Sequence, residues 1–486
     1  MTAAGCMPRR SAEEAEALSF PIHLHSNRKV GHLARQAFFQ PVAREIATEV
    51  VVVGGGISGL AAAASLPHQD FVLLELGPQL GGTSSATAIG AHRFAQGAHY
   101  DLSYPSNFGR EGLALLERLN IVQYDSLRDW WTFKDRQYLI RPEQEERCYL
   151  HGKLVPSVFP DSELKKNFLD LLRPYAREMP LPSTAIDPQH HWLDHLNFAS
   201  YLKKYLPVTP KFMESIDYQM LDDYGATAEQ VSALAGVHYY RCRPYFETPA
   251  PELFSPTEGN YYFIQKLANG LPADQLRTQH LVTSMAPEGK GWTVDVWNNA
   301  TEERIRYRCS KVIYTGQKHL LKYIYSDAYP AFEDILHSPW MVINLELNRP
   351  LEGPAIWQND FLSENGQFLG FVNSGAQQGS EKQVLTAYYC YPYVYPHLLQ
   401  EAENEPDAVV DQTLEFLKQY FQQDLRPYVQ QAVVKVMGHA MPIPAPGYLS
   451  KKRPLEMNGL AFAGSDSGRL PLMFDCLDSG IQAAKR

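Results

Sequence analysis

The sequence predicts an α/β fold with a parallel sheet at its centre, and three features between residues 49 and 75 predict it. The first is a β-branched strand without a polar interruption. The second is a glycine-rich turn that leads into an alanine-rich helix. The third is another apolar strand, which ends on an acidic residue. Together they form a strand–helix–strand unit of the kind that binds a dinucleotide.

The first strand and its turn have the composition that such a unit requires. Residues 50–53 are four valines, which is typical of a parallel strand covered on both faces. Gly54 allows a tight turn after the strand, Gly56 lets the backbone approach a pyrophosphate, and Gly59 permits close packing of the helix. We therefore expect a phosphate-binding turn at this point of the chain.

The helix and the second strand complete the unit. Ile57 and Ser58 fall in the first helical turn, where free N–H groups face the phosphates of a nucleotide. Residues 61–64 are alanines, which keep the helix thin against the sheet. Residues 71–74 predict the next strand, and Glu75 at its end can accept hydrogen bonds from a ribose hydroxyl. A packed unit without a nucleotide is the alternative, but the coincidence of all four parts favours a Rossmann-like binding domain.

Length and charge exclude several classes of protein. A chain of 486 residues can form two or more hydrophobic cores, and 45% hydrophobic with 20% charged residues is ordinary for a globular protein. Lys and Arg number 44 against 54 Asp and Glu, and the net charge of −10 argues against nucleic acid as a partner. No apolar stretch of about 18 residues predicts a transmembrane segment. The sequence does not indicate an oligomeric state.

The first residues contain two short patterns that are found in export signals. Arg9 and Arg10 are followed by acidic residues rather than by an apolar segment, so a twin-arginine signal is not predicted. Residues 2–6 end on Cys6 and resemble the end of a lipoprotein signal, without the apolar segment that precedes one. We expect a cytoplasmic protein. The alternative is a periplasmic lipoprotein whose reading frame begins upstream of Cys6.

The cysteines do not form a recognisable motif. They are scattered singly, without a CxxC pair, so neither a metal site nor a disulfide framework is predicted. We expect each to be a small buried thiol. They are Cys6, Cys148, Cys242, Cys309, Cys390 and Cys476.

The rest of the chain divides by its periodicity. Residues 1–47 predict an irregular extension with one helix around residues 30–39. Apolar residues three and four apart predict helices at 109–119, 162–179, 192–206, 228–240 and 407–420. Strand patterns occur at 279–285, 291–297, 303–308, 312–314, 340–347, 368–373, 383–391 and 432–437. Near the end of the chain, a short apolar strand leads to Gly464, Ser465 and Asp466, and a helix follows at 475–486.

Taken in order, these motifs resemble the flavin-containing amine oxidoreductase superfamily, from the glycine motif onward. The resemblance rests on Gly54, Gly56 and Gly59, on the Gly81-Gly82 pair, and on the terminal residues 464–466 and 478–484. It implies an FAD-binding Rossmann-like domain that is discontinuous in sequence, with an α+β substrate domain. An NAD dehydrogenase usually completes its nucleotide domain from contiguous sequence, so FAD is preferred to NAD.

The resemblance also implies domain boundaries. Residues 48–104, 255–318 and 432–486 would form the FAD-binding domain. Residues 105–254 and 319–431 would form the substrate domain, with a helical insertion in its first part.

The resemblance assigns a role to each cofactor-binding position. Gly81 and Gly82 would bring the backbone close to the phosphates and the flavin, and Val282 would contact adenine through its backbone. Gly464 and Asp466 would lie at the pyrophosphate or the ribitol. Met473 would bring an N–H group toward the flavin, where a helix amino terminus stabilises negative charge. A turn-capping aspartate is the alternative for Asp466.

Three departures from the family pattern bear on function. Thr83 replaces an arginine that usually follows the paired glycines, and Asp475-Cys476 replaces a Gly-Ala pair at the isoalloxazine. Many amine oxidases also place a lysine near flavin N5, whereas this segment offers Trp340 or Met341. The resemblance therefore does not support reaction of reduced flavin with oxygen. It favours a dehydrogenase or desaturase that uses another electron acceptor.

Candidates for the substrate site are aromatic or titratable. Rings can hold an amine by cation–π attraction, although most such rings pack in cores. His439 is the best single candidate for a proton-handling residue, with a loop-bonded histidine as the alternative. Asp222 and Asp223 could bind a cation or cap a helix. The aromatic candidates are Tyr240, Trp340, Trp357 and Tyr389.

The sequence and its resemblance therefore predict an FAD-dependent oxidoreductase that moves a hydride from a C–N or C–C bond of a small molecule, with an amine as the candidate substrate, to flavin. One alternative is an FAD dehydrogenase similar to carotenoid desaturases or protoporphyrinogen oxidase. The other is a non-catalytic flavin-binding protein, because Thr83, Asp475 and the missing lysine depart from the family.

Overall fold

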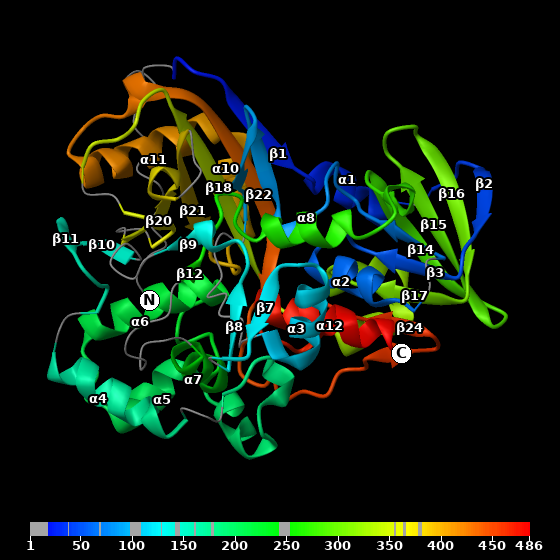
Figure 1. Ribbon diagram of the computed structural model, residues 1–486, viewed down its shortest axis with the longest axis horizontal. Helices are drawn as coiled ribbons and strands as arrows, with labels where there is room; N and C mark the ends of the chain where they lie inside the picture. The colour runs from blue at the N-terminus through cyan, green and yellow to red at the C-terminus, as the bar shows by residue number, and fades with distance from the viewer. Residues whose placement is uncertain are drawn as a thin grey trace.

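The protein is a mixed α/β molecule built around three large sheets, so the predicted fold class is confirmed (Figure 1). The computed structural model describes residues 18–36, 38–67, 70–97, 108–127, 129–140, 146–159, 162–175, 179–242, 253–353, 356–362, 366–377 and 382–486. Cys6 and the Arg9-Arg10 pair lie outside these residues. Among the described helices, none is both long and apolar enough to cross a bilayer.

A six-stranded sheet is the nucleotide-type sheet that the glycine motif predicts. Its order is β13-β4-β3-β17-β24-β23, and all neighbours are parallel except the edge strand β23. The strands predicted at 50–53 and 71–74 are β3 and β4, and both are fully buried. The bounds are Leu276–Arg277 (β13), Phe71–Leu74 (β4), Val50–Val53 (β3), Lys311–Tyr314 (β17), Leu460–Phe462 (β24) and Glu456–Met457 (β23).

Two helices from distant parts of the chain pack on this sheet side by side. They are α2 (Ile57–Ser65) and α12 (Met473–Ala484), drawn in blue and red in Figure 1. A Cβ atom at Gly480 would lie 2.1 Å from the Ser58 carbonyl oxygen, so only glycine permits this approach. The Ser58 hydroxyl donates to the Cys476 carbonyl oxygen at 2.8 Å. The amino-terminal and carboxy-terminal parts of the predicted nucleotide domain are therefore in direct contact through α2 and α12.

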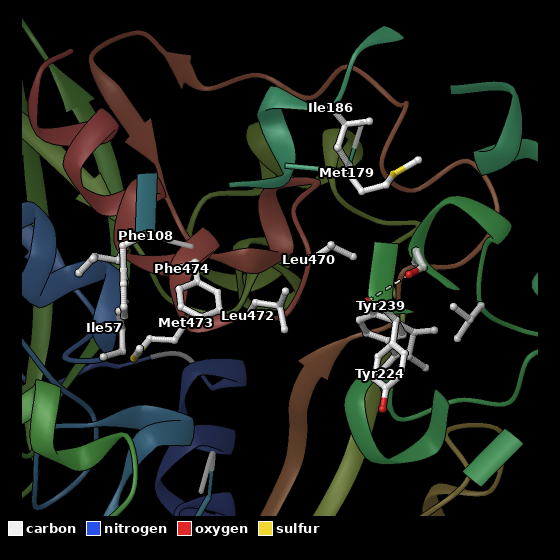
Figure 2. Packing of buried hydrophobic residues seen from close by; sticks show 14 of the residues in the cluster. Ile57, Phe108, Met179, Ile186, Tyr224, Tyr239, Leu470, Leu472, Met473 and Phe474 are labelled. Atoms are coloured by element: carbon white, nitrogen blue, oxygen red, sulfur yellow. Dashed lines mark hydrogen bonds between the residues drawn. The ribbon is translucent and has the colours of Figure 1, made fainter. Parts of the chain in front are cut away.

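The same junction has an apolar core beside it. Figure 2 shows Ile57 close to Met473 and Phe474, with Phe108 beside them. The Phe108 and Phe474 rings meet edge to face with centroids 4.7 Å apart, a favoured aromatic geometry.

A separate antiparallel sheet contains three of the strands predicted between 279 and 308. Its order is β14-β15-β16-β2, and β2 runs parallel to β16. The bounds are His280–Glu288 (β14), Gly291–Asn298 (β15), Glu303–Cys309 (β16) and Val42–Ala47 (β2).

The amino-terminal extension is not irregular where the structure describes it, and this corrects the prediction. It contains β1 (Ile22–Ser26), α1 (Arg28–His32), a 3₁₀ turn (Leu33–Arg35) and β2. The helix expected around residues 30–39 is thus short and begins earlier. Strands β1 and β2 were not predicted because most of their residues are polar or exposed, and the strands with which they pair lie hundreds of residues away in the sequence.

The third sheet has eight strands in the order β1-β22-β18-β21-β20-β19-β10-β11. Residues 432–442, predicted to belong to the FAD-binding domain, lie in β22 of this sheet instead. Helices α10 (Pro396–Asn404) and α11 (Pro406–Phe421) contact strands of this sheet. The remaining bounds are Val429–Pro442 (β22), His337–Leu347 (β18), Gln383–Cys390 (β21), Phe368–Asn373 (β20), Gln358–Phe361 (β19), Glu146–Leu150 (β10) and Lys153–Val155 (β11).

The segment predicted as a helical insertion is rich in helices, but their bounds differ from the prediction. The sequence missed α6 (Pro210–Tyr224) and α8 (Tyr261–Asn269), and residues 188–195 form a 3₁₀ helix before α5. The other helices are Gly109–Arg118 (α3), Glu163–Leu172 (α4), Phe198–Tyr205 (α5), Ala233–Arg241 (α7) and Leu321–Ile324 (α9). The described residues also form three short two-stranded antiparallel sheets: Ala86–Ile89 with His92–Ala95 (β5, β6), Val122–Asp125 with Trp130–Phe133 (β7, β8), and Leu139–Ile140 with Leu253–Phe254 (β9, β12).

Candidate active site

One large cavity, of about 670 Å³, joins the carboxyl ends of the parallel strands to the eight-stranded sheet. Ligands bind at this edge in open α/β sheets. Among the predicted cofactor residues, Gly59 alone is not in the cavity wall. The residues that line it are Gly54, Gly56, Ile57, Ser58, Glu75, Gly81, Gly82, Thr83, Val282, Gly464, Asp466 and Met473. The structure thus brings together positions that lie hundreds of residues apart.

The glycine turn has the geometry of a phosphate cradle. Gly54 has φ +107°, and a Cβ atom there would meet the Thr315 hydroxyl at 2.6 Å. A Cβ atom at Gly59 would lie 1.9 Å from the Gly54 carbonyl oxygen, so this glycine sets how closely α2 packs on the turn. The amino terminus of α2 has no side-chain cap and opens toward the cavity. Free N–H groups and the helix dipole are therefore available to an anion.

Glu75 is held in place by two backbone amides. Its Oε2 accepts from the Gly55 N–H at 2.8 Å and its Oε1 from the Gly77 N–H at 2.7 Å. Burial raises the pKa of this carboxyl, and the two amide hydrogen bonds oppose that rise. Each oxygen has a further lone pair, so the carboxylate can accept from ribose hydroxyls.

The paired glycines lie against the first turn. Gly81 donates its N–H to the Gly55 carbonyl at 2.9 Å, and Gly81 and Gly82 have φ of +131° and +57°. Thr83 places no charge here, but Arg28 and Arg35 from the amino-terminal extension line the same cavity. Arg28 also forms an ion pair with Glu403 at 2.8 Å. These two arginines were not predicted at the site, because residues 1–47 were expected to be irregular.

Asp466 is the acceptor of a buried ion pair. Its Oδ1 accepts from Lys318 Nζ at 2.8 Å, and its Oδ2 accepts from the Lys318 N–H at 2.8 Å. Burial would raise the pKa of Asp466, but Lys318 and nearby His337 hold it well below its usual value. Lys318 Nζ also donates to the Ala463 and Gly316 carbonyls. The carboxylate is therefore charged and fixed where β17 and β24 end.

The unusual Asp475 does not face the cavity. Its Oδ1 accepts from the Ser183 N–H at 3.0 Å and from the Ser183 hydroxyl at 2.7 Å, and the Arg469 guanidinium lies 3.9 Å away. Burial raises the pKa of Asp475 to about 6. Its neighbour Cys476 does line the cavity, as do Leu472 and Met473. The departure from the Gly-Ala pattern thus adds no acid to this wall.

Three histidines meet in another part of the wall. His319, His337 and His439 come from a 3₁₀ turn, β18 and β22, and their side-chain ligand atoms lie within 4.8 Å of one another. The rings of His319 and His439 have centroids 4.0 Å apart. Burial, together with the neighbouring histidines, lowers the pKa of His439 to about 4 and that of His319 to about 2. These two imidazoles are therefore neutral at pH 7, and a proton-handling role for His439 stays a prediction.

A different part of the cavity wall combines acids with aromatic rings. Tyr388 of β21 and Trp340 of β18 line it, as do Asp222 and Asp223 of α6 and Asp360 of β19. Burial raises the pKa of Tyr388, and the charge of Asp222 adds to that rise. The Asp222-Asp223 pair thus lies at the cavity. The sequence had allowed two roles for this pair, cation binding and helix capping.

Three of the predicted substrate aromatics are not in the cavity wall. Tyr240 is buried and donates to Gln219 Oε1, and Trp357 is 1% exposed in an apolar cluster. Tyr389 pairs with the Thr413 hydroxyl at 2.9 Å on the other side of β21. Successive strand residues face opposite sides of a sheet, so Tyr388 reaches the cavity and Tyr389 does not. Among the four candidates only Trp340 lines the cavity, and its contact with a substrate stays a prediction.

Comparisons with known proteins agree with this architecture. A family model described as an NAD(P)-binding Rossmann-like domain matches residues 52–110. No curated protein sequence matches the chain. The structure of putrescine oxidase bound to putrescine superposes with a TM-score of 0.66 at 16% identity and covers 91% of this chain and 99% of that one.

Two further solved structures are similar over nearly the whole chain. Cyclohexylamine oxidase from Brevibacterium oxydans IH-35A has a TM-score of 0.64 at 13% identity, and the match covers 90% of this chain and 98% of that one. A protoporphyrinogen oxidase-like protein of Exiguobacterium sp. 255-15 has a TM-score of 0.62 at 16% identity, with 90% and 98% covered. The protein therefore has the fold of the flavin-containing amine oxidoreductases.

Proposed function

We propose that this protein is an FAD-dependent oxidoreductase that takes a hydride from a C–N bond of a small amine, or from a C–C bond. The observation that carries the proposal is the single cavity lined by the glycine turn, Glu75, the Gly81-Gly82 pair and the residues around Asp466 and Met473. Putrescine oxidase, cyclohexylamine oxidase and a protoporphyrinogen oxidase-like protein share the fold.

The residues of the chain fit a dinucleotide with a flavin. The uncapped amino terminus of α2 would bind the pyrophosphate, and the Glu75 carboxylate would accept from the adenosine ribose. Met473 begins α12, whose amino terminus also lacks a side-chain cap and would stabilise negative charge. When bound, FAD supplies the hydride acceptor. The protein supplies binding, orientation and exclusion of water.

The acids and rings in the cavity favour a cationic substrate. Asp222, Asp223 and Asp360 place carboxylates in the wall, beside the hydroxyl-bearing rings of Tyr218 and Tyr388. Carboxylates and aromatic faces both attract an ammonium group. An amine thus fits this wall better than a neutral polyene does.

The visible spectrum of the purified protein tests the cofactor. We expect absorption bands at about 370 and 450 nm, or their appearance after addition of FAD, as flavins show. A colourless protein that takes up no FAD would refute the proposal. If flavin is bound, anaerobic bleaching by putrescine or cyclohexylamine would support amine chemistry. Bleaching by a polyene or a porphyrinogen, with none by amines, would favour the desaturase-like alternative.

Replacement of Glu75 by glutamine is expected to weaken FAD binding by about 10- to 100-fold. Hydrogen bonds to a charged group are worth about 1.5–3 kcal/mol, and a neutral amide also replaces an acceptor of the Gly55 and Gly77 amides with a donor. Titration of apoprotein with FAD, followed by flavin fluorescence, measures the change. Glu456→Gln, at the antiparallel edge strand of the same sheet, is the control. Equal affinity in wild type and Glu75→Gln would remove Glu75 from the ribose site.

Replacement of Asp222 by asparagine is expected to raise KM for an amine about 10-fold or more, because the side chain keeps its shape and loses its charge. The rate of flavin reduction at saturating amine should change less. Glu214→Gln serves as a matched control, since Glu214 lies on the same helix α6 with an exposed side chain that faces His151. An unchanged KM for Asp222→Asn would place the ammonium elsewhere.

A further inference from the structure

The three-histidine cluster has the donor set of a transition-metal site. His319, His337 and His439 each offer one ring nitrogen, and these atoms all lie within 4.8 Å of one another. Two nitrogens bound to one tetrahedral ion at about 2.0–2.1 Å are about 3.4 Å apart. Small rotations of the rings would therefore bring all three nitrogens onto one ion.

Two ring nitrogens of the cluster are buried without a hydrogen bond among the described residues. They are His319 Nδ1 and His337 Nε2. The His337 side chain is only 4% exposed, and its Nε2 lies 3.7 Å from Asp466 Oδ2, beyond hydrogen-bond distance. Buried polar atoms usually have a partner. A cation between the rings would satisfy both orphaned nitrogens.

The surroundings suit an ion with an open coordination position. All three histidines line the large cavity, so a fourth ligand can reach the ion from that side. The two strands that carry His337 and His439 are hydrogen-bonded neighbours, β18 and β22, with an irregular register at this point. The cluster is therefore built on fixed elements.

We propose that His319, His337 and His439 bind one divalent late transition-metal ion, of the zinc class, with an open position toward the cavity. Three imidazoles without a carboxylate ligand favour zinc, copper, nickel or cobalt over magnesium or calcium. Three histidines and one open position are also the ligand set of several catalytic zinc sites. The inference concerns these side chains alone and does not depend on FAD.

Cobalt and zinc binding to the flavin-free protein, purified without a histidine tag and stripped with a chelator, tests the proposal. We expect one Co²⁺ per chain, with the intense visible absorption of a four-coordinate ion, and displacement of Co²⁺ by Zn²⁺. Mg²⁺ should not compete. A protein that binds no Co²⁺ stoichiometrically would overturn the proposal, whatever its FAD content.

Variants connect the binding to the cluster. His439→Ala and His319→Ala are each expected to weaken Co²⁺ binding at least about 100-fold, more than loss of a supporting partner usually does. Protein atoms surround the His439 ring, but the residue as a whole keeps solvent-exposed surface, so its variant should fold normally. His32→Ala is the matched control, because His32 lines the same cavity outside the cluster. Unchanged binding in His439→Ala and His319→Ala, or equal loss in His32→Ala, would also overturn the proposal.

Discussion

Replacement of Lys318 by methionine is expected to lower the free energy of unfolding by about 3–5 kcal/mol, because it leaves the buried carboxylate of Asp466 without its counter-ion. Lys318 is fully buried and donates from Nζ to Asp466 and to two carbonyl oxygens. Methionine has a similar volume, so the lost charge rather than a cavity dominates the effect. Urea titration of the apoprotein measures the change.

The double variant Lys318→Met with Asp466→Asn is the control for that loss. It removes both charges, and we expect it to recover part of the stability. Asp466→Asn alone completes the comparison. If the loss of stability in the double variant equals the sum of the losses in Lys318→Met and Asp466→Asn, the two residues act independently.

The same ion pair gives a pH dependence with a defined sign. The pKa of Asp466 in the folded protein is held well below its usual value. Its contribution to stability is therefore present above the unfolded pKa of about 3.9, and it is lost as pH falls further. Below about pH 4 the difference in stability between wild type and Lys318→Met should therefore narrow, because the wild type loses the contribution of its charged Asp466. A difference that stays constant down to pH 3 would contradict this origin.

Replacement of Gly59 by alanine is expected to abolish tight FAD binding and to destabilise the fold by about 1–3 kcal/mol. A glycine-to-alanine change within a helix normally stabilises it by about 1 kcal/mol. Here the new Cβ atom would lie 1.9 Å from the Gly54 carbonyl oxygen and 2.9 Å from the Thr315 hydroxyl. Helix α2 must move away from the phosphate turn, and overpacking of this size is destabilising. FAD titration and thermal unfolding measure the two effects.

Gly31→Ala is the matched control for the Gly59 variant. A Cβ atom at Gly31 would meet only Leu76, at an ordinary distance of 3.6 Å. We expect FAD affinity and stability close to those of wild type. If Gly59→Ala binds FAD as tightly as Gly31→Ala does, the close approach of α2 to its turn is not what forms the phosphate site.

The nucleotide-type unit could be predicted because its chemistry is local. Four consecutive valines, the three glycines and the acid at residue 75 each specify a conformation within a few residues. The structure confirms both strands and the helix between them. The site at the far end of the chain was found in the same way, since Gly464 and Asp466 follow a short apolar strand.

Features that depend on partners distant in sequence could not be predicted. Strand β1 pairs with β22 some 400 residues later, and its own residues are largely exposed. The choice between Tyr388 and Tyr389 depends on a one-residue register that apolar patterning does not specify in a strand buried on both faces. His319, His337 and His439 have no motif spacing, and only the packing of two sheets brings them together.

The packing of α2 against α12 limits how early during synthesis the nucleotide-type unit can be completed. Strand β3 and α2 leave the ribosome early, but the contact of Ser58 with Gly480 and Cys476 needs residues that are made more than 400 positions later. Until then the apolar face of α2 that receives α12 has no native cover. The nucleotide-type unit is therefore complete only after α12 has been synthesised.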